Sequence, residues 1–178
     1  MFGKLRAIKK GENLALTVGT ILRDIVNYLI NEGCDVGTRH TAFILLETNS
    51  FVKFCYLLYI KPSDDLESGL ITETANKRIG QWLDDIWQTA FDAQNRKQYV
   101  DVVIKDFANH FQNWCREFSD DNLGLTDRLL EEIAPYALSN FIQRIEKILG
   151  ELSCPYDINV VRQISSDNIG KLIPKINF

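Results

Sequence analysis

The apolar residues between Thr38 and Ile60 organise the rest of the chain. At about 100° per residue, the apolar side chains of this stretch cover both sides of a helix. One side carries Phe43, Ile44, Phe51, Phe54, Cys55 and Leu58, and the other carries Leu45, Val52, Tyr56 and Tyr59. A helix that is apolar all round must be covered all round, so the pattern predicts a buried central helix. Glu47 and Lys53 leave no run near the ~20 apolar residues that a bilayer requires.

One amphipathic helix is predicted before the central helix, over about 14–32. Its buried stripe consists of Leu14, Val18, Ile21, Leu22, Ile25 and Leu29. Asn13 is a suitable N-cap, and Gly33 suits the left-handed conformation that ends many helices. Thr38 is then the predicted cap of the central helix. The short connection predicts that these two helices pack as antiparallel neighbours.

Further helical patterns follow the central helix. A short helix is predicted over about 64–72 with Ser63 as its cap, and a major helix from Thr74 onward. The next major helix is predicted over about 97–118, and the polar residues 92–97 before it form a turn or extend the helix.

The last long helical pattern follows a predicted loop over 119–124, with Thr126 as its cap. Pro135 lies inside this pattern and lacks a backbone donor, which predicts a kink or a break. Gly150 ends the pattern, and a short helix is predicted from Ser153 to about Ile164.

Both ends of the chain are rich in apolar residues. Residues 1–12 carry Phe2, Leu5 and Ile8 among four cations. Such a segment docks on its own domain, or it binds an anionic membrane or the groove of a partner. The tail, residues 165–178, contains Ile169, Leu172, Ile173, Ile176 and Phe178. It is therefore expected to pack back on the bundle or to dock on another chain.

Length and composition agree with one folded domain. The chain has 178 residues, of which 46% are hydrophobic and 25% are charged, as is typical of globular proteins. The expected fold is all-α, a single-domain helical bundle over residues 13–164 with about five major helices and one or two short ones. The net charge of −4 provides no overall field for nucleic acid, so no nucleic-acid partner is expected. A membrane-surface role would be confined to residues 1–12.

The four cysteines are far apart in the sequence and form no CxxC motif. They are Cys34, Cys55, Cys115 and Cys154. Neither they nor the two histidines have the spacing of metal ligands, so no metal site is expected. The sequence predicts four free thiols in a reducing compartment. Arg23 and Asp24 interrupt the first apolar stretch, so no signal peptide is expected and the predicted location is cytoplasmic.

The motifs of several common enzyme classes are missing from the sequence. It contains no glycine-rich phosphate loop, no GxSxG motif and no HExxH motif. No cofactor is therefore expected, and no residue is assigned as catalytic. A non-enzymatic role is favoured over an enzymatic one.

Glu47 is the first of three sites that carry a chemical interpretation. It shares one arc of the central helix with His40, Phe51 and Phe54. A carboxylate there is costly to bury unless it is paired or protonated. It anchors a ligand in an aromatic pocket with these residues, or it is a structural acid paired with a neighbouring helix.

Asp106 and His110 form the second site, four residues apart on one predicted helix. The spacing suits an ordinary ion pair at the edge of the apolar seam. It would also orient the imidazole for catalysis or metal binding. An acid–base enzyme would combine Glu47 and Asp106 with a histidine.

The third site is the set of tryptophans. At helical spacing Trp82, Phe107, Phe111 and Trp114 are expected in the core. Trp87 is offset by about 100° from Ile86, which predicts a partly exposed anchor for a partner. A tryptophan next to Arg78 or Arg96 would also be able to stack on a base.

The leading hypothesis is a non-enzymatic helical protein–protein interaction module that binds another protein or self-associates. Its predicted partner surface combines the basic N-terminus and Trp87 with the tail residues Ile169, Leu172, Ile173, Ile176 and Phe178. The first alternative is a small-molecule-binding domain with Glu47 as its polar anchor, and the second is an acid–base enzyme.

Overall fold

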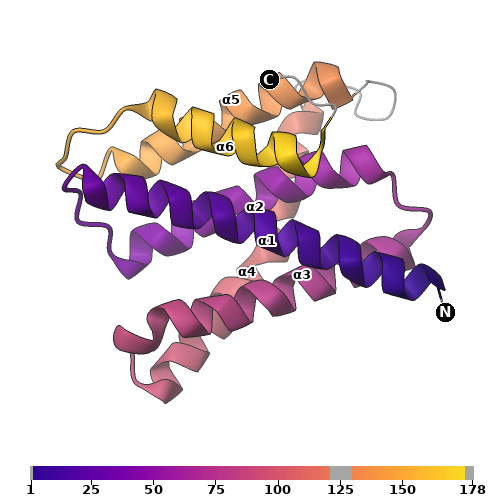
Figure 1. The fold of residues 1–178 in the computed structure, drawn as a ribbon, viewed down its shortest axis with the longest axis horizontal. Coiled ribbons are helices and arrows are strands. Elements are labelled where there is room, and N and C mark those ends of the chain that lie inside the picture. Colours follow the sequence, from indigo (N-terminus) through magenta and orange to yellow (C-terminus); the bar gives the residue numbers. More distant parts are fainter. Residues whose placement is uncertain (1, 121–129, 175–178) are drawn as a thin grey trace.

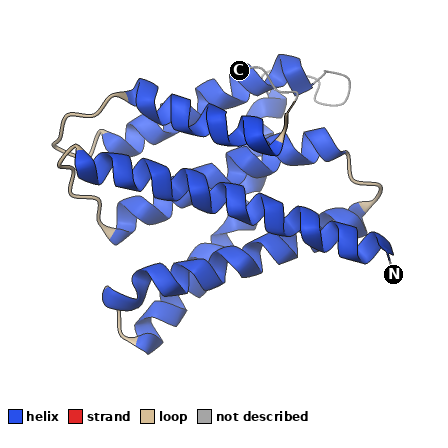
Figure 2. Cartoon of the chain, viewed as in Figure 1, coloured by secondary structure: helices blue, strands red, loops and turns tan. Residues whose placement is uncertain are grey.

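The computed structural model describes residues 2–120 and 130–174. This part of the chain forms six α-helices and one 3-10 helix, without a strand (Figure 2). The elements are α1 (Phe2–Asn31), α2 (Thr38–Ile60), α3 (Asp65–Ile86), η1 (Trp87–Thr89), α4 (Ala93–Asp120), α5 (Leu130–Leu149) and α6 (Ile158–Leu172). The predicted all-α fold class is confirmed.

α2 is the predicted central helix and has the predicted limits, Thr38 and Ile60. Most of its residues are buried, and α1, α4 and α5 pack against it. Among the described helices α2 alone is long and apolar enough to cross a membrane, but the bundle covers most of its apolar stretch. Its N-cap is Gly37, because Thr38 already belongs to the helix, so the predicted cap is wrong by one residue.

The helices form three levels in Figure 1, and α1 connects them. α5 and α6 lie at the top, α1 and α2 in the middle, and α3 at the bottom, while α4 starts beside α3 and rises behind α2 toward the top. α1, the longest helix, contacts α2, α3 and α6. α1 therefore joins the upper and lower levels, together with α2 and α4.

α1 begins at Phe2, so the predicted helix start at Asn13 is wrong. The added turns pack along α3, where Lys10 Nζ lies 2.6 Å from Glu67 Oε1. Contacts with a helix remote in sequence thus order residues that look like a loose basic terminus. Gly33 follows the helix with a φ of 82°, the left-handed conformation predicted for it.

α3 is one continuous helix, so the predicted division between a short helix and one starting at Thr74 is wrong. Its cap is Asp64 rather than Ser63, because the Asp64 carboxylate accepts a hydrogen bond from the Glu67 N–H at 2.7 Å. Gly69 weakens the helical pattern in the sequence, but packing against α1 keeps α3 helical through it.

α4 and α5 also differ from their predicted limits. α4 begins at Ala93, where Asp92 accepts backbone hydrogen bonds, so the polar residues up to position 97 extend the helix. α4 reaches Asp120, and the rest of the predicted 119–124 loop lies outside the described residues together with Thr126. α5 continues through Pro135, so the predicted break at this proline is wrong.

α6 begins at Ile158 with Asp157 as its N-cap and ends at Leu172, so the predicted helix from Ser153 to Ile164 is wrong at both ends. Its second half takes in much of the predicted tail, residues 165–178. The C-terminal residues through Leu172 are therefore an element of the bundle.

Cys34 and Cys154 form a disulfide, with their Cα atoms 5.2 Å apart. It joins the loop after α1 to the loop before α6, next to a hydrogen bond of 2.6 Å from the Asp157 N–H to the Tyr28 hydroxyl. Cys55 and Cys115 take no part in this disulfide. The prediction of four free thiols is wrong, because the fold brings together two cysteines 120 positions apart.

Candidate functional site

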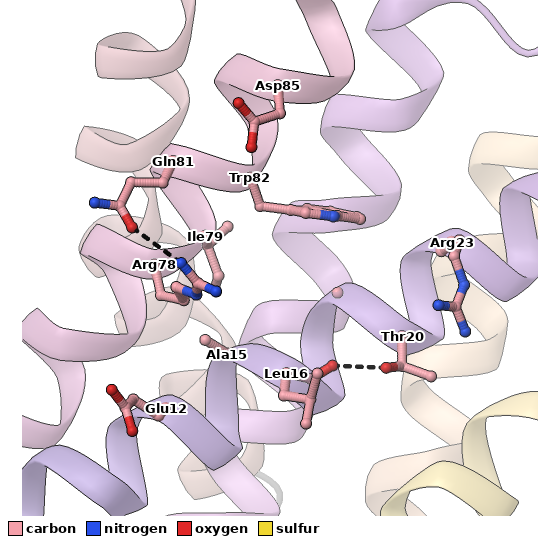
Figure 3. A pocket seen from close by; sticks show the side chains of 11 residues that line it. Glu12, Ala15, Leu16, Thr20, Arg23, Arg78, Ile79, Gln81, Trp82 and Asp85 are labelled. Carbon is pink, nitrogen blue, oxygen red and sulfur yellow. Dashed lines mark hydrogen bonds between the residues drawn. The ribbon is translucent and has the colours of Figure 1, made fainter.

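A groove between α1 and α3 is the candidate site, and we name it the Trp82 groove (Figure 3). It is lined by Glu12, Ala15, Leu16, Gly19, Thr20, Arg23, Arg78, Ile79, Gln81, Trp82 and Asp85. The two helices run in the same direction, because Gly11 lies against Ile71 and Gly19 lies against Trp82. The Trp82 ring is 3.8 Å from the position that a Cβ atom of Gly19 would occupy, so the indole rests close to the α1 backbone.

The centre of the Trp82 groove is apolar. Ala15 and Ile79 are buried beneath it. Leu16 forms one wall and is 70% exposed, while Trp82 forms the other and is half-buried. Large apolar side chains left in water next to one another are typical of surfaces that bind another molecule.

Charged side chains of both signs surround this apolar centre. Arg78 Nη1 donates to Gln81 Oε1 at 3.4 Å (Figure 3), and Arg23 pairs with Asp24 just outside the groove. Glu12 and Asp85 add negative charge to the rim. An apolar centre within a polar rim is the usual composition of a protein–protein interface.

The size of the Trp82 groove limits what it holds. Its volume is about 210 Å³, below the roughly 300–1,000 Å³ of small-molecule pockets. It therefore suits one apolar side chain presented by a larger partner better than a whole small molecule.

Sequence reasoning missed Leu16 and placed Trp82 in the core. Leu16 stands two positions after Leu14 and outside the phase of the buried stripe. An exposed leucine on the polar side of the first helix was therefore visible in the pattern. The position of Trp82 in the same groove was not visible in the sequence, because it depends on how α3 packs on α1.

Glu47 lies in a separate polar cluster between α2, α4 and α5. The residue is 8% exposed, and Arg144 Nη1 is 3.4 Å from both carboxylate oxygens. His110 Nε2 is 3.1 Å from Oε1 of the same carboxylate. The Arg144 guanidinium is oriented by Asn140, whose Oδ1 accepts from Nε at 2.6 Å. Glu47 thus has the arrangement of a structural acid paired with neighbouring helices.

The predicted aromatic pocket around Glu47 is not found in the described part of the chain. The hollow next to Glu47, of about 400 Å³, is lined by Asn140, Gln143, Arg144, Lys147 and Ile148. Phe51 instead stacks on Phe141 at 4.6 Å. Phe54 packs edge-on against Trp114, and His40 lies 3.8 Å from Glu151. The four predicted ligand residues are therefore not brought together at one cavity.

The predicted pairing of Asp106 with His110 is also wrong. Asp106 is exposed and forms no ion pair with the residues that the structure describes. His110 reaches α2 and Glu47 instead, because its ring lies at the buried edge of α4. The structure brings Glu47 and one histidine together but leaves Asp106 out, so the predicted set of three acid–base residues does not converge.

Lys53 is the other buried charge of α2. It is 8% exposed, and its Nζ lies 4.2 Å from the centre of the Phe111 ring. Burial lowers the pKa of Lys53, and the nearby Cys115 thiol opposes this shift. Burial also raises the pKa of Cys115 to about 11, so this thiol is a poor nucleophile near neutral pH.

Most of the predicted partner surface is inside the bundle. Trp87 is 3% exposed and packs against Phe91 and Tyr99, so the predicted exposed anchor is wrong. Ile169 and Ile173 are fully buried and Leu172 is half-buried, whereas Ile176 and Phe178 lie outside the described residues. The core positions predicted for Phe107 and Trp114 are confirmed.

Within residues 2–120 and 130–174, no group of three or more His, Cys, Asp or Glu side chains is placed to hold a metal ion. No protein family model, curated protein or solved structure matches this chain. Functional inference therefore rests on the surfaces and clusters described above.

Proposed function

We propose that this chain is a non-enzymatic helical protein-interaction module, and that the Trp82 groove receives an apolar side chain of a partner protein. The observation that carries this proposal is that the exposed Leu16 and the half-buried Trp82 line one groove of single-side-chain size. Covering both side chains would remove apolar surface from water, which favours association. Tryptophan is also enriched among the residues that dominate binding energy at interfaces.

The groove replaces the partner surface that the sequence indicated. Trp87, Ile169 and Ile173 are buried within this chain and are unavailable to a partner unless the bundle opens. The α1–α3 side keeps its apolar groups at the surface in the folded chain. The proposal therefore retains the interaction module but moves its binding surface to α1 and α3.

The small-molecule alternative has weaker support. The Glu47 carboxylate already has Arg144 and His110 as partners, and no aromatic side chain lines the adjacent hollow. The acid–base enzyme has weaker support still, because Asp106 is exposed and forms no ion pair with Glu47, His110 or any other described residue. Neither alternative explains the exposed Leu16.

The proposal is tested by placing a charge in the groove. Leu16→Asp should reduce capture of partner proteins from a lysate of the source organism by at least about tenfold, because a desolvated carboxylate opposes docking. Tyr136→Asp is the matched control, since Tyr136 is 60% exposed on α5 and remote from the groove. Equal capture by both variants, with both folded by circular dichroism, would contradict the proposal.

The compartment is a further part of the proposal. The cytoplasmic prediction depended on four free thiols and on the absence of a recognisable signal peptide, and the Cys34–Cys154 disulfide favours an oxidising compartment instead. Thiols trapped with N-ethylmaleimide in intact cells would distinguish the two locations. We expect Cys34 and Cys154 to escape labelling, whereas labelling of both would restore the cytoplasmic prediction.

A further inference from the structure

A second groove lies at the N-terminal ends of α1 and α3, and we name it the N-terminal groove. Figure 2 shows these two ends next to each other. Ala7 lines this groove and Leu16 lines the Trp82 groove, and nine positions place them about 180° apart on α1. The two grooves therefore open on different sides of the α1–α3 contact.

The N-terminal groove has a buried apolar floor at Ala7, and apolar surface stays uncovered at its edge. Ala7 and Leu70 line it, and Leu66 stands at its edge with 82% of the residue exposed. The groove encloses about 910 Å³, far more than one side chain fills. The groove therefore has room for a small molecule or for a segment of a folded surface, and the charges of its walls distinguish between these occupants.

The two walls of the N-terminal groove carry opposite charges. Lys4, Arg6 and Lys10 stand on the α1 wall, and Asp65, Glu67 and Glu73 stand on the α3 wall. Lys10 and Glu67 neutralise each other across the groove. The other four are exposed and form no ion pair with described residues, and Lys61 adds a cation from the α2–α3 connection.

We infer that the occupant of the N-terminal groove is a second copy of this chain. A two-fold interface uses the same patch twice, so the basic α1 wall of each copy would face the acidic α3 wall of the other. Lys4 and Arg6 would then meet Asp65 and Glu73 in two equivalent places, and Leu66 of each copy would be covered. A membrane or nucleic acid of one charge sign would instead be repelled by the acidic wall.

The inference is tested by reversing the charge of each wall in the full chain. By analytical ultracentrifugation the natural sequence should form a dimer that weakens as salt is added. Lys4→Glu/Arg6→Glu and Asp65→Lys/Glu73→Lys should each be monomeric, since both walls then carry one sign. An equimolar mixture of the two variants should restore the dimer, because the reversed walls complement each other.

Two control variants distinguish pairing at this groove from an effect of net charge and from binding at the Trp82 groove. Lys147→Glu/Lys171→Glu changes the net charge as much as Lys4→Glu/Arg6→Glu, but on exposed positions of α5 and α6, and should remain dimeric. Leu16→Asp should also remain dimeric, so a wrong proposal for the Trp82 groove can be distinguished from a wrong inference about the N-terminal groove.

A monomeric natural sequence, or a mixture that stays monomeric, would overturn the inference. So would a Lys4→Glu/Arg6→Glu variant that stays dimeric and loses only sedimentation with anionic vesicles.

Discussion

The two sides of α1 meet the rest of the molecule in different ways. Toward α6 the contact is closed, because α6 buries Val161 and Ile169 and its approach loop is tied to α1 by Cys34–Cys154. Toward α3 the helices touch closely, but grooves with exposed Leu16 and Leu66 remain on either side. The α6 side is occupied by this chain alone, whereas the α3 side leaves apolar surface uncovered.

α1 thus has one side that contributes to stability, toward α6, and one side that leaves grooves for binding, toward α3. On the α6 side, a covalent bond and the hydrogen bond between Tyr28 and Asp157 hold the elements together. On the α3 side, Gly11 lets the backbones approach until a Cβ atom there would be 2.6 Å from the Ile71 carbonyl oxygen. The contact between the α1 and α3 backbones at Gly11 holds α3 in place. The grooves on either side of this contact can therefore stay unfilled.

The largest expected effect comes from breaking the closed side. Cys34→Ala/Cys154→Ala should lower the free energy of unfolding by about 2–5 kcal/mol in urea, because the disulfide closes a long loop and restricts the unfolded chain. Cys115→Ala, which removes a half-buried thiol outside the disulfide, is the control and should cost less than about 1 kcal/mol. An unchanged free energy of unfolding in the double variant would mean that the Cys34–Cys154 disulfide does not stabilise the α6 side.

A smaller effect is expected at the close approach of α1 to α3. Gly11→Ala should cost about 1–3 kcal/mol, because the added methyl group meets the Ile71 carbonyl and the Thr74 side chain. Gly3→Ala is the matched control in the same helix, since nothing lies within 4 Å of its Cβ position. Thermal unfolding should show Gly3→Ala neutral or slightly stabilised, and an equally tolerated Gly11→Ala would contradict the close contact.

The smallest expected effect is a change in acid sensitivity on the α3 side. The side-chain hydrogen bond from Lys10, with further hydrogen bonds from Ser63, lowers the pKa of Glu67 to about 2 from an ordinary value of 4.5. A lowered pKa in the folded state contributes stability above pH 4.5, which is lost as the pH falls toward about 2. Glu67→Gln should flatten the stability curve within this window.

Lys10→Met should also flatten the stability curve between pH 4.5 and about 2, because it removes the main hydrogen-bond partner of Glu67. Urea unfolding at several pH values checks both variants. A curve between pH 4.5 and 2 that matches the natural sequence in both variants would show that this contact does not link α1 to α3.

The central helix could be predicted from the sequence because its signal is local and strong. Apolar residues all round a continuous stretch fix its burial, and the flanking turn residues fix its limits. The start of α1 could not be predicted in this way. Its first turns look like a solvated basic terminus, and their helical packing depends on Glu67 and Ile71 of α3.

The chemistry of the candidate sites was predicted only in part. The cost of burying Glu47 indicated a partner, but the pattern could not identify Arg144, which is 97 positions away. The disulfide escaped prediction for a similar reason, because cysteine spacing does not determine connectivity. Both grooves depend on the relative placement of α1 and α3, which no local pattern encodes.

The most direct test of the contrast between the two sides of α1 is site-specific photocrosslinking in a lysate of the source organism. A photoreactive amino acid at position 16 reports on the Trp82 groove, and one at position 160 reports on the exposed surface of α6. We predict a crosslinked protein partner from position 16 and none from position 160. Crosslinks of equal yield from both positions, or from position 160 alone, would contradict the assignment of binding to the α3 side.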